Sequence, residues 1–218
     1  TLAGVREARK RGSKVLSICN VLGSTLTRES DGIIYTHAGP EIGVASTKAY
    51  TAQLAAIYLF AFYLARIRRS LSEVVLGKNL DSLCKLPHLM AHILKEQSLI
   101  ANLSRRHSHF GSFLYLGRNI NFPSALEGAL KLKEISYIPA EGYAAGEMKH
   151  GPIALIDEYR AVVCIAPYSK VYEKMVSNIQ EIRSRKGKII AIASKGDKEI
   201  KESIKDVIYI PKCEELFS

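Results

Sequence analysis

An internal repeat is the strongest constraint on what this chain of 218 residues can fold into. Residues 6–35 and 180–210 each contain a basic helical segment, a glycine, an apolar strand-like run, a loop and a second strand-like run. The alternative to a repeat is that the two segments share only the pattern of helix and strand that any two α/β units have in common. Three pairs of residues correspond at offsets of 174 or 175: Gly12 with Gly187, Asp31 with Asp206, and Val15 with Ile189.

Helical segments alternate with short apolar runs at residues 113–116, 161–165 and 188–192. This alternation predicts an α/β fold in which helices cover parallel sheets. The repeat divides the chain into one partial and one nearly complete copy. We expect the later part of a first domain in residues 1–69, connecting helices in 70–107 with a break at Pro87, and most of a second domain in 108–218.

Composition narrows the class of protein. With 47% hydrophobic and 24% charged residues, the chain can bury a core and is not of a disordered or fibrous class. Its four cysteines are 49 to 80 residues apart, which gives neither a metal-binding pair nor a dense disulfide framework. We therefore expect a reducing, cytoplasmic location.

The net charge of +10 is compatible with nucleic acid, an acidic membrane surface or an anionic small substrate. Basic runs at residues 6–14 and 66–69 contain no interleaved aromatic residues and no nucleic-acid motif, so we interpret them as solvated faces. We expect no nucleic-acid partner.

Residues 52–65 form the longest apolar run, and basic residues follow it. A membrane span needs about 20 apolar residues, and this run has 14. We expect a buried core helix or a helix at a subunit interface, and no membrane span.

Three charged residues share one face of a predicted helix at residues 125–137. At 100° per residue, Glu127, Lys131 and Glu134 lie within about 60° of one another. The simplest interpretation is a surface ion pair between Glu127 and Lys131, which would contribute about 0.2–0.5 kcal/mol. A second interpretation is a cluster that carries out acid–base chemistry.

The next segment, residues 140–152, favours the second interpretation because it places small residues around charged ones. Its glycines and Pro152 predict a tightly shaped backbone. A carboxylate and an imidazole such as His150 are the groups that move protons beside a carbonyl and at a ring oxygen. A structural histidine is the alternative.

Residues 38–50 lead into the apolar run. Ser46 or Thr47 suits the N-cap of the helix that follows. A helix N-terminus flanked by hydroxyl groups also favours polyols and anions, although capping alone would explain both residues.

Three stretches resemble the isomerase region of the glucosamine-6-phosphate synthases, also called glutamine–fructose-6-phosphate aminotransferases (isomerizing). They are CNVLGSTLTRESD (19–31), EIGVASTKAY (41–50) and ALEGALKLKEISYIPAEGYAAGEMKHGP (125–152). The resemblance implies two sugar-isomerase (SIS) domains, each a parallel sheet flanked by helices in a flavodoxin-like three-layer sandwich.

The resemblance also implies an activity. Members of this family use ammonia from glutamine to convert fructose 6-phosphate to glucosamine 6-phosphate, without a metal or a nicotinamide cofactor. The expected partners are these sugar phosphates, a second copy of the chain in a homodimer, and a glutaminase domain of the same parent chain.

Roles for individual residues follow from the resemblance alone. Glu134 corresponds to the base that moves a proton between C1 and C2, with Lys131 assisting at the substrate oxygen and Glu127 beside it. His150 corresponds to a histidine that opens the sugar ring across the dimer interface. Val44 and Ser46 correspond to sugar-binding positions.

The resemblance further predicts a fragment. The family's phosphate-binding loop would precede Thr1, and the tail lysine that forms an imine with the sugar would follow Ser218, so the chain alone should be inactive or nearly so. The alternative function is a non-catalytic SIS module that binds a sugar phosphate.

Overall fold

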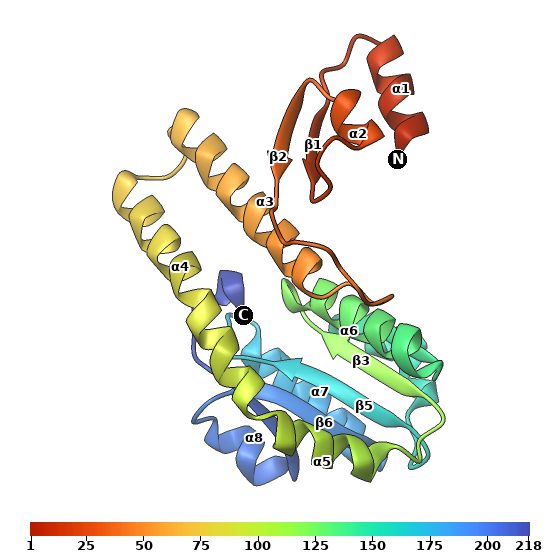
Figure 1. The fold of residues 1–218 in the computed structure, drawn as a ribbon. Coiled ribbons are helices and arrows are strands. Elements are labelled where there is room, and N and C mark those ends of the chain that lie inside the picture. The colour runs from red at the N-terminus through yellow and green to blue at the C-terminus, as the bar shows by residue number, and fades with distance from the viewer. The chain divides into compact units, whose positions relative to one another are not determined.

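The computed structural model describes residues 1–218, which form two compact units, Thr1–Leu83 and Cys84–Ser218. The first unit contains a two-stranded parallel sheet (Figure 1). Its elements are α1 (Leu2–Lys10), β1 (Leu16–Cys19), α2 (Thr25–Arg28), β2 (Gly32–Tyr35) and α3 (Lys48–Ile67). Helix α4 (Glu73–Lys95) begins in the first unit and ends in the second.

The second unit contains a five-stranded parallel sheet with the order β4-β3-β5-β6-β7. Its strands are β3 (Phe113–Gly117), β4 (Ala140–Ala144), β5 (Ala161–Ala166), β6 (Lys188–Ser194) and β7 (Asp206–Ile210). Its helices are α5 (Gln97–His107), α6 (Asn121–Ser136), α7 (Tyr172–Ser184) and α8 (Lys198–Ser203), with the 3₁₀ helices η1 (Ala145–His150), η2 (Pro152–Leu155) and η3 (Glu215–Phe217).

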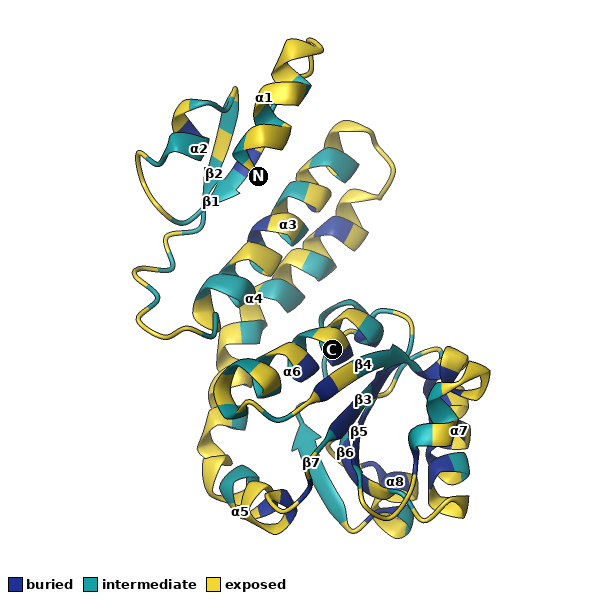
Figure 2. Ribbon diagram, turned by 90° about the vertical axis from the view of Figure 1, so that its right-hand side faces the viewer, coloured by how far each residue is buried: buried dark blue, intermediate teal, exposed yellow.

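Helices cover both faces of this sheet. Helices α5 and α6 lie on one side and α7 and α8 on the other (Figure 2). Apolar side chains of α7 and α8, including Met175 and Ile200, pack against one face of β3, β5 and β6. On the opposite face, Ala129 of α6 packs with residues of β3 and β5 such as Phe113 and Val163.

The prediction of parallel sheets flanked by helices is confirmed. In chain order the strands of the second unit are arranged 2-1-3-4-5, which is the flavodoxin-like order. Helices link the parallel strands because such strands need a crossover connection.

The two ladders pair residues at the same separation along the chain. Leu16 pairs with Gly32 in the β1–β2 ladder, and Ile190 pairs with Asp206 in the β6–β7 ladder, so the partners are 16 residues apart in each. The register is therefore the same at an offset of 174, which relates Val15 to Ile189, and at an offset of 175, which relates Asp31 to Asp206.

The turn before each ladder distinguishes the two offsets. The left-handed residue after the helix is Gly12 (φ 78°) in the first unit and Lys186 (φ 62°) in the second. Gly187 is instead confined by packing, since a Cβ there would lie 2.6 Å from Ile182 Cγ2. By conformation Gly12 therefore corresponds to Lys186, at the offset of 174 that also relates Val15 to Ile189, and not to Gly187.

Pro87 does not break the connecting segment, so that expectation is wrong. It lies inside α4, which continues to Lys95. A proline in a helix removes one backbone hydrogen bond, here to the carbonyl of Leu83, and commonly kinks the helix. Pro87 is exposed, so solvent can hydrate the freed carbonyl.

Helix α3 is not a core helix of this chain, because only Ala56 and Phe62 are buried (Figure 2). The helix has 20 residues and is thus longer than its apolar run; by length and composition it could cross a membrane. Buried helices of soluble proteins meet the same criteria. A subunit interface stays a prediction for its exposed apolar side chains, among them Ile57, Leu59 and Tyr63.

Two glycines set the position of α6 on the sheet. A Cβ at Gly142 of β4 would lie 2.8 Å from the backbone N and Cα of Leu126 in α6, and a Cβ at Gly128 would lie 2.9 Å from the ring of Tyr115. The backbones of β4 and α6 therefore approach each other directly, with no side chain between them.

Substituting Gly142 should consequently destabilise the second unit. We expect Gly142→Ala to lower the free energy of unfolding by about 1–3 kcal/mol, the range for overpacking a tight contact. Gly111→Ala is the matched control, since a Cβ there meets nothing within 4 Å. Urea denaturation of both variants measures the difference, and equal stability of the two would contradict this account of the packing.

Candidate active site

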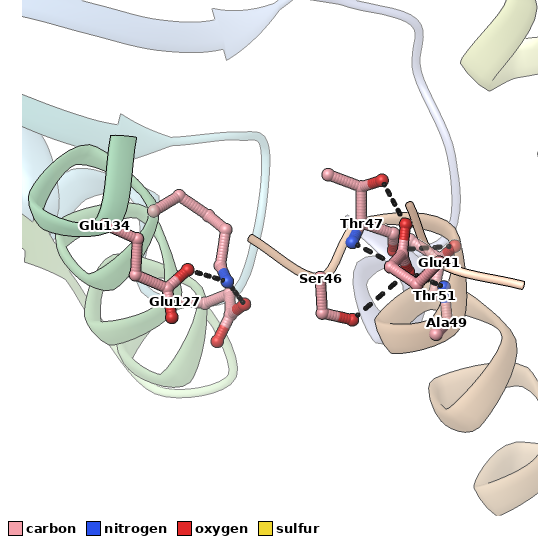
Figure 3. Close-up of polar contacts among 8 residues, drawn as sticks. Glu41, Ser46, Thr47, Ala49, Thr51, Glu127 and Glu134 are labelled. Carbon is pink, nitrogen blue, oxygen red and sulfur yellow. Dashed lines mark hydrogen bonds and ion pairs between the residues drawn. The ribbon is translucent and has the colours of Figure 1, made fainter. Parts of the chain in front are cut away.

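Helix α6 brings Glu127, Lys131 and Glu134 together, as their spacing predicts. Lys131 Nζ lies 2.5 Å from Glu134 Oε2 and 3.4 Å from Glu127 Oε1. Figure 3 shows the two carboxylates meeting at the ammonium group between them. About a quarter of each side chain is exposed, so the cluster is partly screened from water but open to a ligand.

The ion pairs fix the charge of the cluster. The hydrogen bond to Glu134 raises the pKa of Lys131 above its ordinary value, and the charge of Glu127 adds to the shift against partial desolvation. A raised pKa keeps the ammonium form at neutral pH, and its stabilising effect is lost only when the pH rises through that alkaline value. Lys131 occupies Glu134 Oε2, which leaves Oε1 available to accept a proton.

The end of α6 holds the cluster on a defined last turn. Tyr137 follows the helix in the left-handed conformation, with φ 60°. Its N–H donates to the carbonyl of Lys133, and Pro139 follows two residues later, where a helix cannot continue. Glu134 therefore lies on the terminal turn of α6, beside the chain that enters β4.

His150 ends the compact segment after β4. Ala145 and Met148 of η1 are fully buried, whereas the side chain of His150 is 75% exposed. Gly151 follows with φ 143°, a conformation that favours glycine. The tightly shaped backbone is thus observed, and it presents the imidazole to solvent.

His150 does not contact the α6 cluster within this chain. Its Nε2 lies 4.0 Å from Glu147 Oε2, a long contact between two exposed side chains. The neighbouring Lys149 instead bonds to Glu181 of α7 at 2.9 Å, which ties η1 to the rest of the unit.

In the first unit, the segment before α3 is organised by Glu41. Its carboxylate accepts hydrogen bonds from Ala49 N at 3.1 Å, from Thr47 N and Thr47 Oγ1 at 3.3 Å each, and from Ser46 Oγ at 3.4 Å (Figure 3). The Ala49 N–H, followed by the Thr47 donors, holds the pKa of Glu41 below its ordinary value against partial desolvation.

This arrangement modifies the prediction of the helix cap. Thr47 is the N-cap of α3, but its side chain makes no capping hydrogen bond. Glu41 instead accepts hydrogen bonds from the N–H groups of Thr47 and Ala49 at the start of the helix, where the helix dipole also favours a negative charge. The available sequence signal for this cap is a glutamate a few residues before the start of the helix.

The start of the same segment is held by Asn20, at the end of β1. Its Oδ1 accepts hydrogen bonds from Thr36 Oγ1 and Ala38 N, and its Nδ2 donates to the carbonyl of Gly39 at 2.7 Å. Asn20 thus anchors residues 36–39, and Glu41 anchors residues 46–49. Val44 lies between these two anchored stretches, with 93% of its surface exposed.

Comparison with protein families gives one clear match. A family model described as the SIS domain matches residues 1–63 and 109–217. The chain belongs to the SIS domain family. The match leaves out residues 64–108, which contain α4 and α5.

Relatives of this SIS chain carry a more specific name. It is 52% identical over 218 residues to a glutamine–fructose-6-phosphate aminotransferase (isomerizing) of Thermus thermophilus and 53% identical over 213 residues to one of Chlorobaculum tepidum. The alignments cover 100% and 98% of this chain but only 36% and 34% of those proteins. The chain thus spans about a third of the length of these relatives.

Solved structures agree with the family assignment. The C-terminal domain of glucosamine-fructose-6-phosphate aminotransferase from Francisella tularensis superposes with a TM-score of 0.93 at 39% identity, covering 100% of this chain and 61% of that one. A putative phosphosugar isomerase from Clostridium difficile has a TM-score of 0.80 at 19% identity over 98% of this chain and 59% of that one, which shows a shared fold.

Proposed function

We propose that this chain is the isomerase region of a glutamine–fructose-6-phosphate aminotransferase and acts on fructose 6-phosphate. The observation that carries the proposal is the Glu127–Lys131–Glu134 cluster on α6, in a chain about half identical along its length to relatives of that name. The region then contributes ketose–aldose isomerisation to the synthesis of glucosamine 6-phosphate.

In this proposal Glu134 is the base. Converting a ketose derivative to an aldose derivative removes a proton from C1 and returns one to C2, through an enediol or enolamine. A carboxylate with one free oxygen can accept the first proton and deliver it to the neighbouring carbon, so it is unchanged at the end of the cycle. The Lys131 ammonium at 2.5 Å stabilises the negative charge on which this role depends.

The other residues of the cluster bind and polarise the substrate. Lys131 has three N–H donors and can reach a substrate oxygen as well as the two carboxylates. Glu127 then holds Lys131 from the opposite side and accepts from a sugar hydroxyl. In the first unit, Val44 and Ser46 are proposed sugar contacts, supported by the exposed, anchored segment in which they lie.

We place His150 in the active site of a partner subunit of a homodimer, where it would open the sugar ring. Two observations support this role: the imidazole is exposed, and it contacts no member of the α6 cluster of its own chain. An imidazole can donate and accept protons near neutral pH, as opening a hemiketal requires.

Mixing two inactive variants of the parent protein tests the shared site. Glu134→Gln and His150→Ala should each have little activity alone, and activity should return when the two are unfolded and refolded together. Each mixed dimer then contains one site with both residues intact. If the mixture stays as inactive as its components while sedimentation shows mixed dimers, His150 does not act across the interface.

The remaining parts of the proposal concern the parent protein. A glutaminase domain in the same polypeptide would supply ammonia, and the isomerase chemistry would need no metal or nicotinamide cofactor. The four free cysteines agree with a cytoplasmic location. The net charge of +10 suits an anionic sugar phosphate.

The proposal is tested by measuring glucosamine 6-phosphate formed from fructose 6-phosphate and glutamine. We expect turnover by the full-length parent protein and little or none by residues 1–218 alone. A non-catalytic SIS module would instead bind fructose 6-phosphate in equilibrium dialysis without turning it over in either form. That result would replace the enzymatic proposal with the binding one.

A further inference from the structure

Two histidines on α4 lie outside the candidate active site and meet at their ring nitrogens. His88 and His92 are one helical turn apart and exposed. Their Nε2 atoms are 3.2 Å apart, and the rings meet edge to face with 4.7 Å between centroids. In the neutral state at most one of the two nitrogens carries a proton in this contact, so at least one lone pair is directed at the other ring.

We propose that His88 and His92 chelate one divalent transition-metal ion such as Zn²⁺, Ni²⁺ or Cu²⁺. Imidazole suits these metals, and metal–nitrogen distances are about 2.0–2.1 Å. Two nitrogens 3.2 Å apart would then subtend an angle of about 100° at the ion, close to the tetrahedral value. The ion would take the place of the shared proton with little movement of either ring.

The spacing supports the same ligand class. Histidines at positions i and i+4 of a helix form the chelating half of the H-E-x-x-H zinc motif. Here the sequence is H-L-M-A-H, with Leu89 at the position of the glutamate base, so the site would bind a metal without the hydrolytic group. The short side chain of Ala91 adds no bulk to this turn.

The surroundings make this an open, two-ligand site. The histidines line a hollow of about 690 Å³ with Glu96, and facing residues include Lys195, Lys198 and Lys201. No group of three or more His, Cys, Asp or Glu side chains is arranged to hold a metal ion, so water would complete the coordination. The lysine ammonium groups oppose a cation, and we expect weaker binding than at a closed structural zinc site.

A metal ion bound to His88 and His92 should stabilise helix α4 locally. Pro87, directly before His88, lacks the N–H that would bond to Leu83, which weakens the helix at this point. An ion held by both imidazoles would fix the turn that follows. Metal binding should therefore protect the backbone amides around residues 88–92 from hydrogen exchange.

Titration calorimetry on the chain without a polyhistidine tag tests the proposal. We expect saturable binding of Zn²⁺ and Ni²⁺ and none of Mg²⁺, which prefers oxygen ligands. His88→Gln and His92→Gln should each weaken Zn²⁺ binding by at least about tenfold, because each leaves a single imidazole. His109→Gln is the matched control, since His109 is exposed but outside the pair.

The outcomes separate the alternatives. Unchanged Zn²⁺ affinity in both His88→Gln and His92→Gln would overturn the proposal, as would an equal loss in His109→Gln. Failure to detect any Zn²⁺ or Ni²⁺ binding would show that the contact is only a hydrogen bond between neutral rings. Circular dichroism spectra matching those of the unmodified chain would show that the variants are folded.

Discussion

Replacing Glu134 with Gln in the full-length parent protein should lower kcat by about 10²- to 10⁴-fold, the usual contribution of a positioned acid or base. The amide keeps the size of the side chain and an oxygen that can accept from Lys131, but it cannot take up a proton from carbon. The KM for fructose 6-phosphate should change little. Steady-state kinetics of glucosamine 6-phosphate formation measures both parameters.

The neighbouring positions provide the controls. Lys133→Gln alters an exposed side chain on the same helix and should leave kcat and KM near those of the unmodified protein. Glu127→Gln weakens the hold on Lys131 without removing the proposed base, so its loss of kcat should be much smaller. Turnover by Glu134→Gln equal to that of Lys133→Gln would show that Glu134 is not the base.

The α6 cluster could be predicted from sequence because helical geometry is local. Positions 127, 131 and 134 lie on one face of any regular helix, and the long side chains then meet at the distances observed. The strands β3, β5 and β6 were predictable for a similar reason, since their runs of apolar residues are typical of strands covered on both faces.

Strand β4 was not recognisable from its sequence, AEGYA, which has few residues that favour strands. It forms because it pairs with β3 and because Gly142 lets α6 lie directly on it. Both causes involve residues distant in the chain. Pro87 differs in cause: the helical residues on either side of it continue α4 through the position of a single helix breaker.

Replacing Glu41 should also lower activity strongly, because Glu41 holds the segment that contains Val44 and Ser46. In Glu41→Ala the four donors of Ser46, Thr47 and Ala49 lose their common acceptor, and the start of α3 loses a compensating negative charge. We expect kcat/KM for fructose 6-phosphate to fall about ten- to a hundredfold, since displacing a substrate contact by about 1 Å can cost about 10²-fold.

The loss should appear mainly in KM, because Glu41 lies with the proposed sugar contacts and not with the base. Glu41→Gln should be intermediate, since the amide keeps one acceptor oxygen but loses the charge. Glu7→Gln is the matched control: Glu7 is an exposed glutamate of the same unit and forms only a surface pair with Arg11.

The pH dependence of order in residues 41–49 shows whether Glu41 acts through its negative charge or only through packing. Because the pKa of Glu41 is lowered in the folded chain, its contribution is fully present above the ordinary glutamate range and is lost as the pH falls through the lowered value. In Glu41→Gln this acid-dependent loss of order at residues 41–49 should disappear, as hydrogen exchange at low pH would show. If the unmodified chain and Glu41→Gln lose protection over the same pH range, or if Glu41→Ala leaves KM unchanged, Glu41 does not position this segment.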